Sequence, residues 1–255
     1  MKLIDSHCHL YLPEFQADLA ETIKRAQDIG VQRFYLPAID SHTTQPMLAL
    51  EEQFPGNCKA MMGLHPCSVK ADYERELEIV QGFLKKRKFA AMGETGLDFY
   101  WDRSFEEQQY KSFRQQIRWA LYYNLPVVIH SRESMDQCIK VVEELQDGRL
   151  TGIFHCFSGT IESAKQIIDL GFYLGIGGVV TYKKSGLAEV LKEIDLSHIV
   201  LETDAPYLPP APFRGKRNES SYLAYIVEKL AEIKGVSTAE IAKTTTANAE
   251  KIFAC

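Results

Sequence analysis

The stretch Val127-Val128-Ile129-His130-Ser131-Arg132 shows the pattern that decides the fold of this chain. A short β-branched apolar run is typical of a strand buried on both faces, as in a parallel sheet. The run stops at a histidine, where polar residues begin. The same arrangement returns in Ile153-Phe154-His155. We therefore expect functional polar side chains at the C-terminal ends of buried strands.

On either side of these two strands, strand-like and helix-like patterns alternate along the chain. We expect strands at residues 3–10, 34–39, 59–65, 90–97, 127–130, 152–157, 172–175 and 199–203. Helical spacing follows each strand, at 14–28, 44–53, 72–87, 105–123, 133–146, 161–170, 184–193 and 219–234, and again at 238–253 after a candidate N-cap, Ser237. Eight strands that are each followed by a helix predict a (β/α)8 TIM barrel with an additional C-terminal helix. An open doubly wound sheet is the alternative, but no glycine-rich turn follows the first strand.

The size and charge of the chain limit its class. Barrels of this kind run to about 250 residues, so we expect a single domain over residues 1–255. The net charge of −5 argues against bulk attraction to nucleic acid, so phosphate binding would depend on local cations. We find no signal-peptide pattern and no long apolar run. Six cysteines without CxxC spacing favour reduced thiols, and we expect a cytoplasmic protein with no membrane contact and no stable protein partner.

Histidines and carboxylates collect at the ends of five predicted strands, and these ends meet at one face of a barrel. One such histidine would be unremarkable, but each buried imidazole or carboxylate needs a partner. A metal centre provides partners for all of them at once, and a donor set without cysteine favours Zn, Mn or similar ions. The candidate ligands are His7, His9, Glu94, His130, His155 and Asp204.

The alternation of side chains along a strand separates ligands from neighbours. His7 and His9 point to one side, and Cys8 points to the other. If His7 faces the barrel interior, Asp5 lies one layer below it and could orient a ligand. Of the two carboxylates at the last strand, Asp204 is nearer the strand end and is the expected ligand, with Glu202 in support.

The motifs of the chain resemble those of the TatD family of metal-dependent hydrolases, which belong to the amidohydrolase-like barrels. The resemblance rests on DSHCHL at 5–10, GLHP at 63–66, GETGLD at 93–98, HSR at 130–132, HCFSG at 155–159 and ETDAP at 202–206. It implies two divalent metal ions (Zn, Mn or Mg) that share Glu94. One ion would bind His7, His9, Glu94 and Asp204, and the other would bind Glu94, His130 and His155.

The resemblance also implies deoxyribonuclease activity. Two metals can polarise a phosphoryl oxygen and generate a bridging hydroxide, which would attack phosphorus. Glu94 would hold the two ions, and Asp204 would handle the proton, so both are candidate catalytic residues. Because the chain is acidic, we expect binding of single-stranded DNA or strand ends, which favours exonuclease action. We predict the 3'-5' direction, although no residue pattern in the sequence fixes the strand polarity.

Several residues near the predicted barrel mouth could contact substrate. His65 is a candidate phosphate or leaving-group contact, and Arg217 belongs to the strongest local basic cluster, after the last strand. The run Phe99-Tyr100-Trp101 could stack unpaired bases or could pack over the mouth. Arg132 follows a ligand and could point either toward the centre or away from it.

Two other functions remain open at this point, because a barrel does not fix its chemistry. The same metals could serve an ester or amide hydrolase, such as an aminoacyl-tRNA deacylase. The chain could also be a non-catalytic metal-binding barrel.

Overall fold

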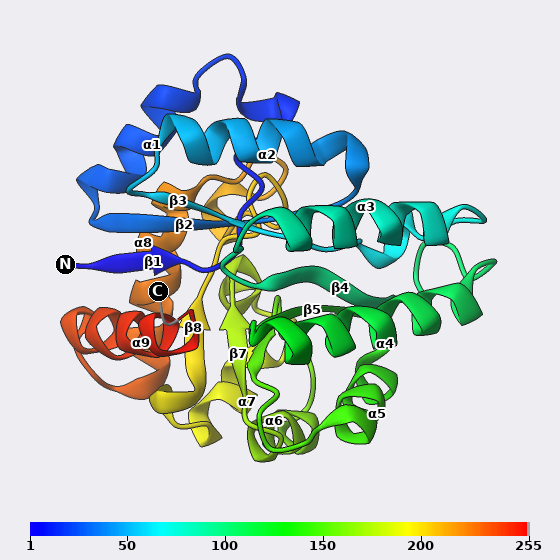
Figure 1. Cartoon of the computed structure of the whole chain (residues 1–255). Coiled ribbons are helices and arrows are strands. Elements are labelled where there is room, and N and C mark those ends of the chain that lie inside the picture. Colours follow the sequence, from blue (N-terminus) through cyan, green and yellow to red (C-terminus); the bar gives the residue numbers. More distant parts are fainter. Residues whose placement is uncertain (254–255) are drawn as a thin grey trace.

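Eight parallel strands form the centre of the molecule in the computed structural model, which describes residues 1–253 (Figure 1). The strands are β1 Leu3–Asp5, β2 Val31–Pro37, β3 Cys58–Met61, β4 Met92–Asp98, β5 Val127–Arg132, β6 Gly152–Phe154, β7 Phe172–Ile176 and β8 Ile199–Leu201. Each lies at one of the eight predicted positions. The alternation of strands and helices confirms the TIM-barrel prediction.

Two hydrogen-bonded ladders make up the barrel. One has the order β1-β2-β3 and the other has the order β4-β5-β6-β7-β8. An isolated parallel bridge between Met62 and Met92 joins β3 to β4. On the other side, the backbone N–H of Ser6 donates to the carbonyl oxygen of Leu201 over 3.0 Å, which links β1 to β8.

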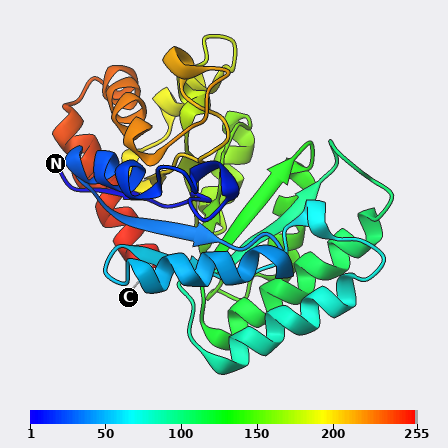
Figure 2. The same ribbon diagram turned by 90° about the horizontal axis from the view of Figure 1, so that it is seen from above.

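Helices lie around the strands (Figure 2). They are α1 Leu19–Asp28, α2 Ser41–Gln53, α3 Tyr73–Lys86, α4 Glu106–Tyr123, α5 Met135–Leu145, α6 Ile161–Asp169, α7 Leu187–Glu193, α8 Leu223–Lys234 and α9 Thr238–Ile252. Ser237 caps α9 as predicted, because its hydroxyl accepts the N–H of Glu240. The helices α1 and α8 begin later than predicted, since short 3₁₀ turns at Pro13–Phe15 and Ser220–Tyr222 precede them. No helix in residues 1–253 is long and apolar enough to cross a membrane.

The additional helix α9 closes the end of the barrel at which the strands begin. Eight residues, one from each strand or the position before it, form one buried cluster with α9: Ile4, Tyr35, Met61, Ala91, Val128, Ile153, Tyr173 and Val200. Ala249, Ile252 and Phe253 belong to the same cluster. Since apolar side chains fill this end, polar groups can gather in the barrel only at the opposite end, where the strands finish.

The first strand is shorter than the predicted 3–10, and the difference matters for the site. After Asp5 the chain leaves the ladder and bonds to the loop that follows β8. The N–H of His9 donates to Ala205 over 2.7 Å, and the N–H of Asp204 donates to His7 over 2.9 Å. The HxH segment is therefore held on one side by the β8 loop and on the other by β2, to whose Tyr35 carbonyl the N–H of Cys8 donates over 3.0 Å.

The cysteines of the described residues, Cys8, Cys58, Cys67, Cys138 and Cys156, carry free thiols. Cys255 lies outside the described residues.

Replacing Gly96 by alanine is expected to lower the free energy of unfolding by at least about 2 kcal/mol. Gly96 pairs with His130 across β4 and β5, and its φ is +143°. A Cβ there would lie 2.0 Å from the His130 carbonyl oxygen, so the two strands would have to separate. Urea denaturation followed by circular dichroism measures the change.

Gly82→Ala in α3 is the matched control. A Cβ at Gly82 meets nothing within 4 Å, and alanine suits a helix better, so stability should rise by about 0.5–1 kcal/mol. Equal free energies of unfolding for Gly96→Ala and Gly82→Ala would show that a Cβ at Gly96 does not force β4 and β5 apart.

Candidate metal centre

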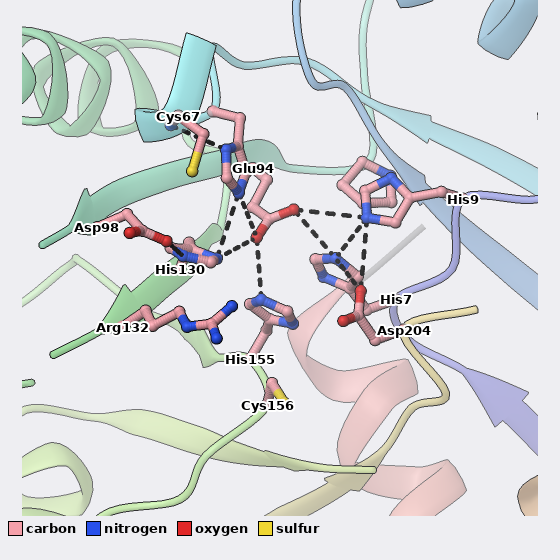
Figure 3. A network of polar contacts seen from close by, with 12 residues as sticks. His7, His9, Cys67, Glu94, Asp98, His130, Arg132, His155, Cys156 and Asp204 are labelled. Carbon is pink, nitrogen blue, oxygen red and sulfur yellow. Dashed lines mark hydrogen bonds and ion pairs between the residues drawn. The ribbon is translucent and has the colours of Figure 1, made fainter. Parts of the chain in front are cut away.

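Glu94 in β4 lies at the centre of a buried cluster of histidines (Figure 3). Its Oε1 atom is 2.9 Å from Nδ1 of His130, at the end of β5. The same oxygen is 2.9 Å from Nε2 of His155, just after β6. These side chains come from three neighbouring strands, so the register of the sheet brings them together.

The other carboxylate oxygen of Glu94 faces a different set of side chains. Oε2 is 3.2 Å from Nε2 of His7 and 3.6 Å from Nε2 of His9. Oδ1 of Asp204 approaches the same two nitrogens, at 3.7 Å and 3.5 Å. One carboxylate thus separates two groups of potential ligands.

The protonation of His130 can be read from its outer partner. Its Nε2 lies 2.9 Å from Oδ2 of Asp98, and an ionised carboxylate only accepts hydrogen bonds. Nε2 therefore carries a proton. By the same rule Nδ1, 2.9 Å from Oε1 of Glu94, is also protonated while no cation lies between the two atoms, and a bound metal ion would take the place of that proton. Sequence interpretation gave Asp98 no role, although Asp98 follows Glu94 by four residues in the same strand.

Similar outer contacts orient two more rings. Nδ1 of His9 lies 2.8 Å from the hydroxyl of Tyr11, whose one hydrogen is donated to the carbonyl oxygen of Pro37. His9 must then donate from Nδ1, which leaves the lone pair on Nε2 facing the centre. Nδ1 of His155 lies 3.4 Å from Oε1 of Glu202. Such outer contacts to carboxylates are typical of metal-bound histidines.

His65, which follows β3, differs from the other histidines of the cluster. Its Nδ1 accepts the backbone N–H of Cys67 over 3.0 Å. In the neutral ring the proton then sits on Nε2, which lies 3.4 Å from Oε1 of Glu94. This nitrogen is a hydrogen-bond donor rather than a metal ligand. The geometry supports the predicted substrate contact, which stays a prediction.

The charges of the cluster fit a cation site. Burial opposes ionisation of Glu94, but the charges of His155, His65 and His7 hold the pKa of its carboxyl well below the usual range. Burial lowers the pKa of His155, yet Glu94 and Glu202 raise it well above the usual range. The buried carboxylate thus requires positive charge around it. Three groups of three side chains have ligand atoms close enough to hold a metal ion: His7, His9 and Glu94; His7, His155 and Asp204; and His65, Glu94 and His130. The third group contains His65 in place of the predicted His155, so the geometry leaves His65 within reach of a metal ion as well.

The two predicted supporting carboxylates occupy different places. Glu202 lies beside His155 and accepts the N–H of Cys156. Asp5 accepts from the N–H and hydroxyl of Thr203, at 3.0 Å and 2.6 Å, and from the N–H of His7 at 3.4 Å. It therefore ties together the backbones that carry His7 and Asp204, and it does not touch the imidazole nitrogens. Burial raises the pKa of Asp5 to about 7, against the hydrogen bonds from Thr203 that lower it.

Arg217 lies apart from this cluster. Its guanidinium binds the carboxylate of Asp18 at 2.6 Å and 2.7 Å and lies 4.7 Å from the ring centre of Phe15. The charge is therefore compensated locally, and the predicted substrate contact of Arg217 stays a prediction.

Histidines and carboxylates around a shared glutamate, at the strand ends of a parallel barrel, are suited to the chemistry of a metal-dependent hydrolase. A family model described as TatD related DNase matches residues 4–254. The chain belongs to this TatD family, which confirms the resemblance seen in its motifs.

Known relatives match along nearly the whole chain. The metal-dependent hydrolase YabD of Bacillus subtilis is 38% identical over 98% of both chains. A protein of Erwinia tasmaniensis named 3'-5' ssDNA/RNA exonuclease TatD is 30% identical over 98% of this chain and 99% of its own. The crystal structure of YjjV, a TatD homologue from Escherichia coli, superposes with a TM-score of 0.94 at 32% identity and covers 99% of this chain and 98% of its own.

The variant Asp98→Asn is expected to weaken metal binding by roughly 10- to 100-fold. The asparagine oxygen can still accept the N–H groups of Tyr100 and Trp101, so its amide would face Nε2 of His130. His130 would then have to move its proton to Nδ1 and lose the lone pair that faces the centre. Calorimetric titration of the metal-free protein with Mn or Zn measures the affinity.

Asp102→Asn provides the control, because Asp102 is an exposed neighbour that binds Lys70. Its metal affinity should equal that of the wild type. Unchanged affinity in Asp98→Asn would show that the outer carboxylate does not orient His130.

Proposed function

We propose that this chain is a two-metal phosphodiesterase that acts on DNA, as a 3'-5' exonuclease on single strands or strand ends. One observation carries the proposal: each oxygen of Glu94 faces its own set of histidine nitrogens. A carboxylate in this position can hold two cations side by side. The name of the Erwinia relative, 3'-5' ssDNA/RNA exonuclease, supports the substrate and the direction of cleavage.

The ligands divide as the two oxygens of Glu94 do. One ion would be held by His7, His9, Glu94 Oε2 and Asp204, and the other by Glu94 Oε1, His130 and His155. Nitrogen and carboxylate ligands suit Zn or Mn, and Mg is the third candidate. When bound, two divalent ions polarise a phosphoryl oxygen and lower the pKa of a water molecule.

Side chains of the site would transfer the proton of the attacking water and would bind the phosphate. Asp204 is the most accessible of the proposed carboxylate ligands, with 13% of its side chain exposed against 3% for Glu94. It can therefore take the proton of an attacking water at the open side of the centre. His65 can donate its Nε2–H to a phosphate oxygen or to the leaving oxygen. With metal ions bound, the outer contacts of His9 and His130 would keep one proton on the outer nitrogen of each ring and leave the inner nitrogen free as a ligand.

The first test is cleavage of end-labelled single-stranded DNA with Mg, Mn or Zn, before and after chelation. We expect a ladder of successive products that disappears with chelator and returns with one metal. Glu94→Gln should reduce the rate by at least about 100-fold, because the shared ligand is lost. The exposed Glu143→Gln serves as control and should cleave normally.

Cleavage that persists in chelator or in Glu94→Gln would overturn the nuclease proposal. If the metal-loaded protein leaves DNA intact but hydrolyses ester or amide substrates, the metal centre serves that other bond.

A second test separates the donor role of His65 from a ligand role. His65→Ala should keep the metal content of the wild type and reduce kcat by roughly 100-fold, since one hydrogen bond to the reacting phosphate is lost. His42→Ala, at an exposed position, is the control. Metal content is measured by mass spectrometry of the purified protein. Loss of one ion per chain would instead make His65 a ligand.

A further inference from the structure

A cation at the end of β5 and two exposed aromatic rings on the loop that follows β4 lie together. The guanidinium carbon of Arg132 is 3.9 Å from the ring centre of Tyr100 and 5.3 Å from that of Trp101. The two rings meet edge to face, at 4.9 Å and 84°. Yet Tyr100 is 49% exposed and Trp101 is 68% exposed. Rings that only packed over the barrel mouth would be buried, so this arrangement leaves aromatic surface open to a ligand.

Arg132 has no carboxylate partner within 4 Å in residues 1–253, in contrast to Arg217 and Arg114, which bind Asp18 and Glu144. The guanidinium end of Arg132 points toward the side of the centre where His155 lies (Figure 3). An uncompensated cation beside a proposed phosphodiesterase centre is suited to bind phosphate.

One carboxylate fixes this group of side chains to the metal centre. Oδ1 of Asp98 accepts the backbone N–H groups of Tyr100 and Trp101, at 3.0 Å and 3.1 Å. Oδ2 of the same side chain binds Nε2 of His130 at 2.9 Å. The aromatic turn and the candidate ligand therefore share one anchor, and a ligand on the rings would have a fixed position relative to Glu94.

We propose that Tyr100, Trp101 and Arg132 form a nucleotide subsite, in which an unpaired base stacks on Trp101 and the guanidinium binds an adjacent phosphate. The inference rests on the proposed nuclease function and adds to it the reason for single-strand preference. In a duplex both faces of each base are already stacked, whereas an unpaired base can stack on an aromatic ring. The subsite recognises a base by its π-face and not by its identity, so binding would depend little on sequence.

Trp101 also provides the means to test the subsite, because the chain has only two tryptophans. In Trp119→Phe the remaining fluorescence comes from Trp101 alone. The probe is octathymidylate with phosphorothioate linkages, which slow cleavage, added to the metal-loaded protein. We expect saturable quenching, and little quenching by an octamer of the same length whose sugars lack bases.

Anisotropy of the labelled octamer then compares variants of the full chain. Trp101→Ala should raise Kd by roughly 5- to 100-fold, the range that base stacking on one aromatic residue supports. Trp101→Phe keeps a stacking surface and should restore most of the affinity. Arg132→Ala should raise Kd for the normal octamer and for the octamer without bases alike, since both carry the phosphates.

Tyr122→Ala is the matched control for the loss of an exposed ring. Tyr122 is 77% exposed near the end of α4, and β5 starts only a few residues later, so this ring lies at the opposite end of the barrel. Its Kd should be that of the wild type.

The possible failures are distinguishable. If Trp101→Ala binds both octamers with wild-type affinity while the protein cleaves DNA, the subsite is wrong and the nuclease function stands. If the octamer quenches Trp101 but the metal-loaded protein cleaves no DNA, the subsite stands and the nuclease function fails. Quenching by both octamers alike would overturn the stacking contact.

Discussion

The buried carboxylate of Glu94 is the constraint on which the rest of the structure depends. Removing an ionised group from water is costly unless positive charge and hydrogen bonds replace the solvent. Here three histidine nitrogens lie within 3.5 Å of Oε1, from His65, His130 and His155, and His7 approaches Oε2. This arrangement requires the ends of β3, β4, β5 and β6 and the segment after β1 to meet at one point. A parallel barrel provides such a meeting point, since all its strands finish at the same face.

The histidines can bind a metal ion beside this carboxylate only if their protons lie on the outer nitrogens. Asp98 and Tyr11 impose that arrangement on His130 and His9, and the backbone of Cys67 imposes the opposite one on His65. The imidazole nitrogens that face Glu94 therefore differ in whether they carry a proton when the ring is neutral. Outer contacts decide which of them can bind a cation and which can donate a hydrogen bond to a substrate.

The sequence predicted the parts of the site that depend on local pattern. Apolar runs that end in histidine identified His130 and His155, because such a run predicts a buried strand and its last residue lies at the strand end. Alternation along a strand predicted which neighbouring side chains face the barrel interior. The same rule overextended β1, since hydrogen bonds from the β8 loop take over after Asp5. Asp98 and Tyr11 were missed because their roles depend on ring protonation and on distances between separate elements. A basic cluster in the sequence likewise did not reveal that Asp18 neutralises Arg217.

The distribution of free cations explains how an acidic chain could act on a polyanion. With a net charge of −5, the surface as a whole offers little attraction to DNA. Attraction at the site must therefore come from positive groups that lie close to it and that no carboxylate neutralises. Arg217 forms an ion pair with Asp18. Arg132 has no carboxylate partner within 4 Å in residues 1–253, and it lies over the ring of Tyr100, beside the centre that would hold the two metal ions. A single cation beside the centre can bind the phosphate of a nucleotide at a strand end but cannot follow the backbone of a long duplex, which agrees with the proposed action on strand ends.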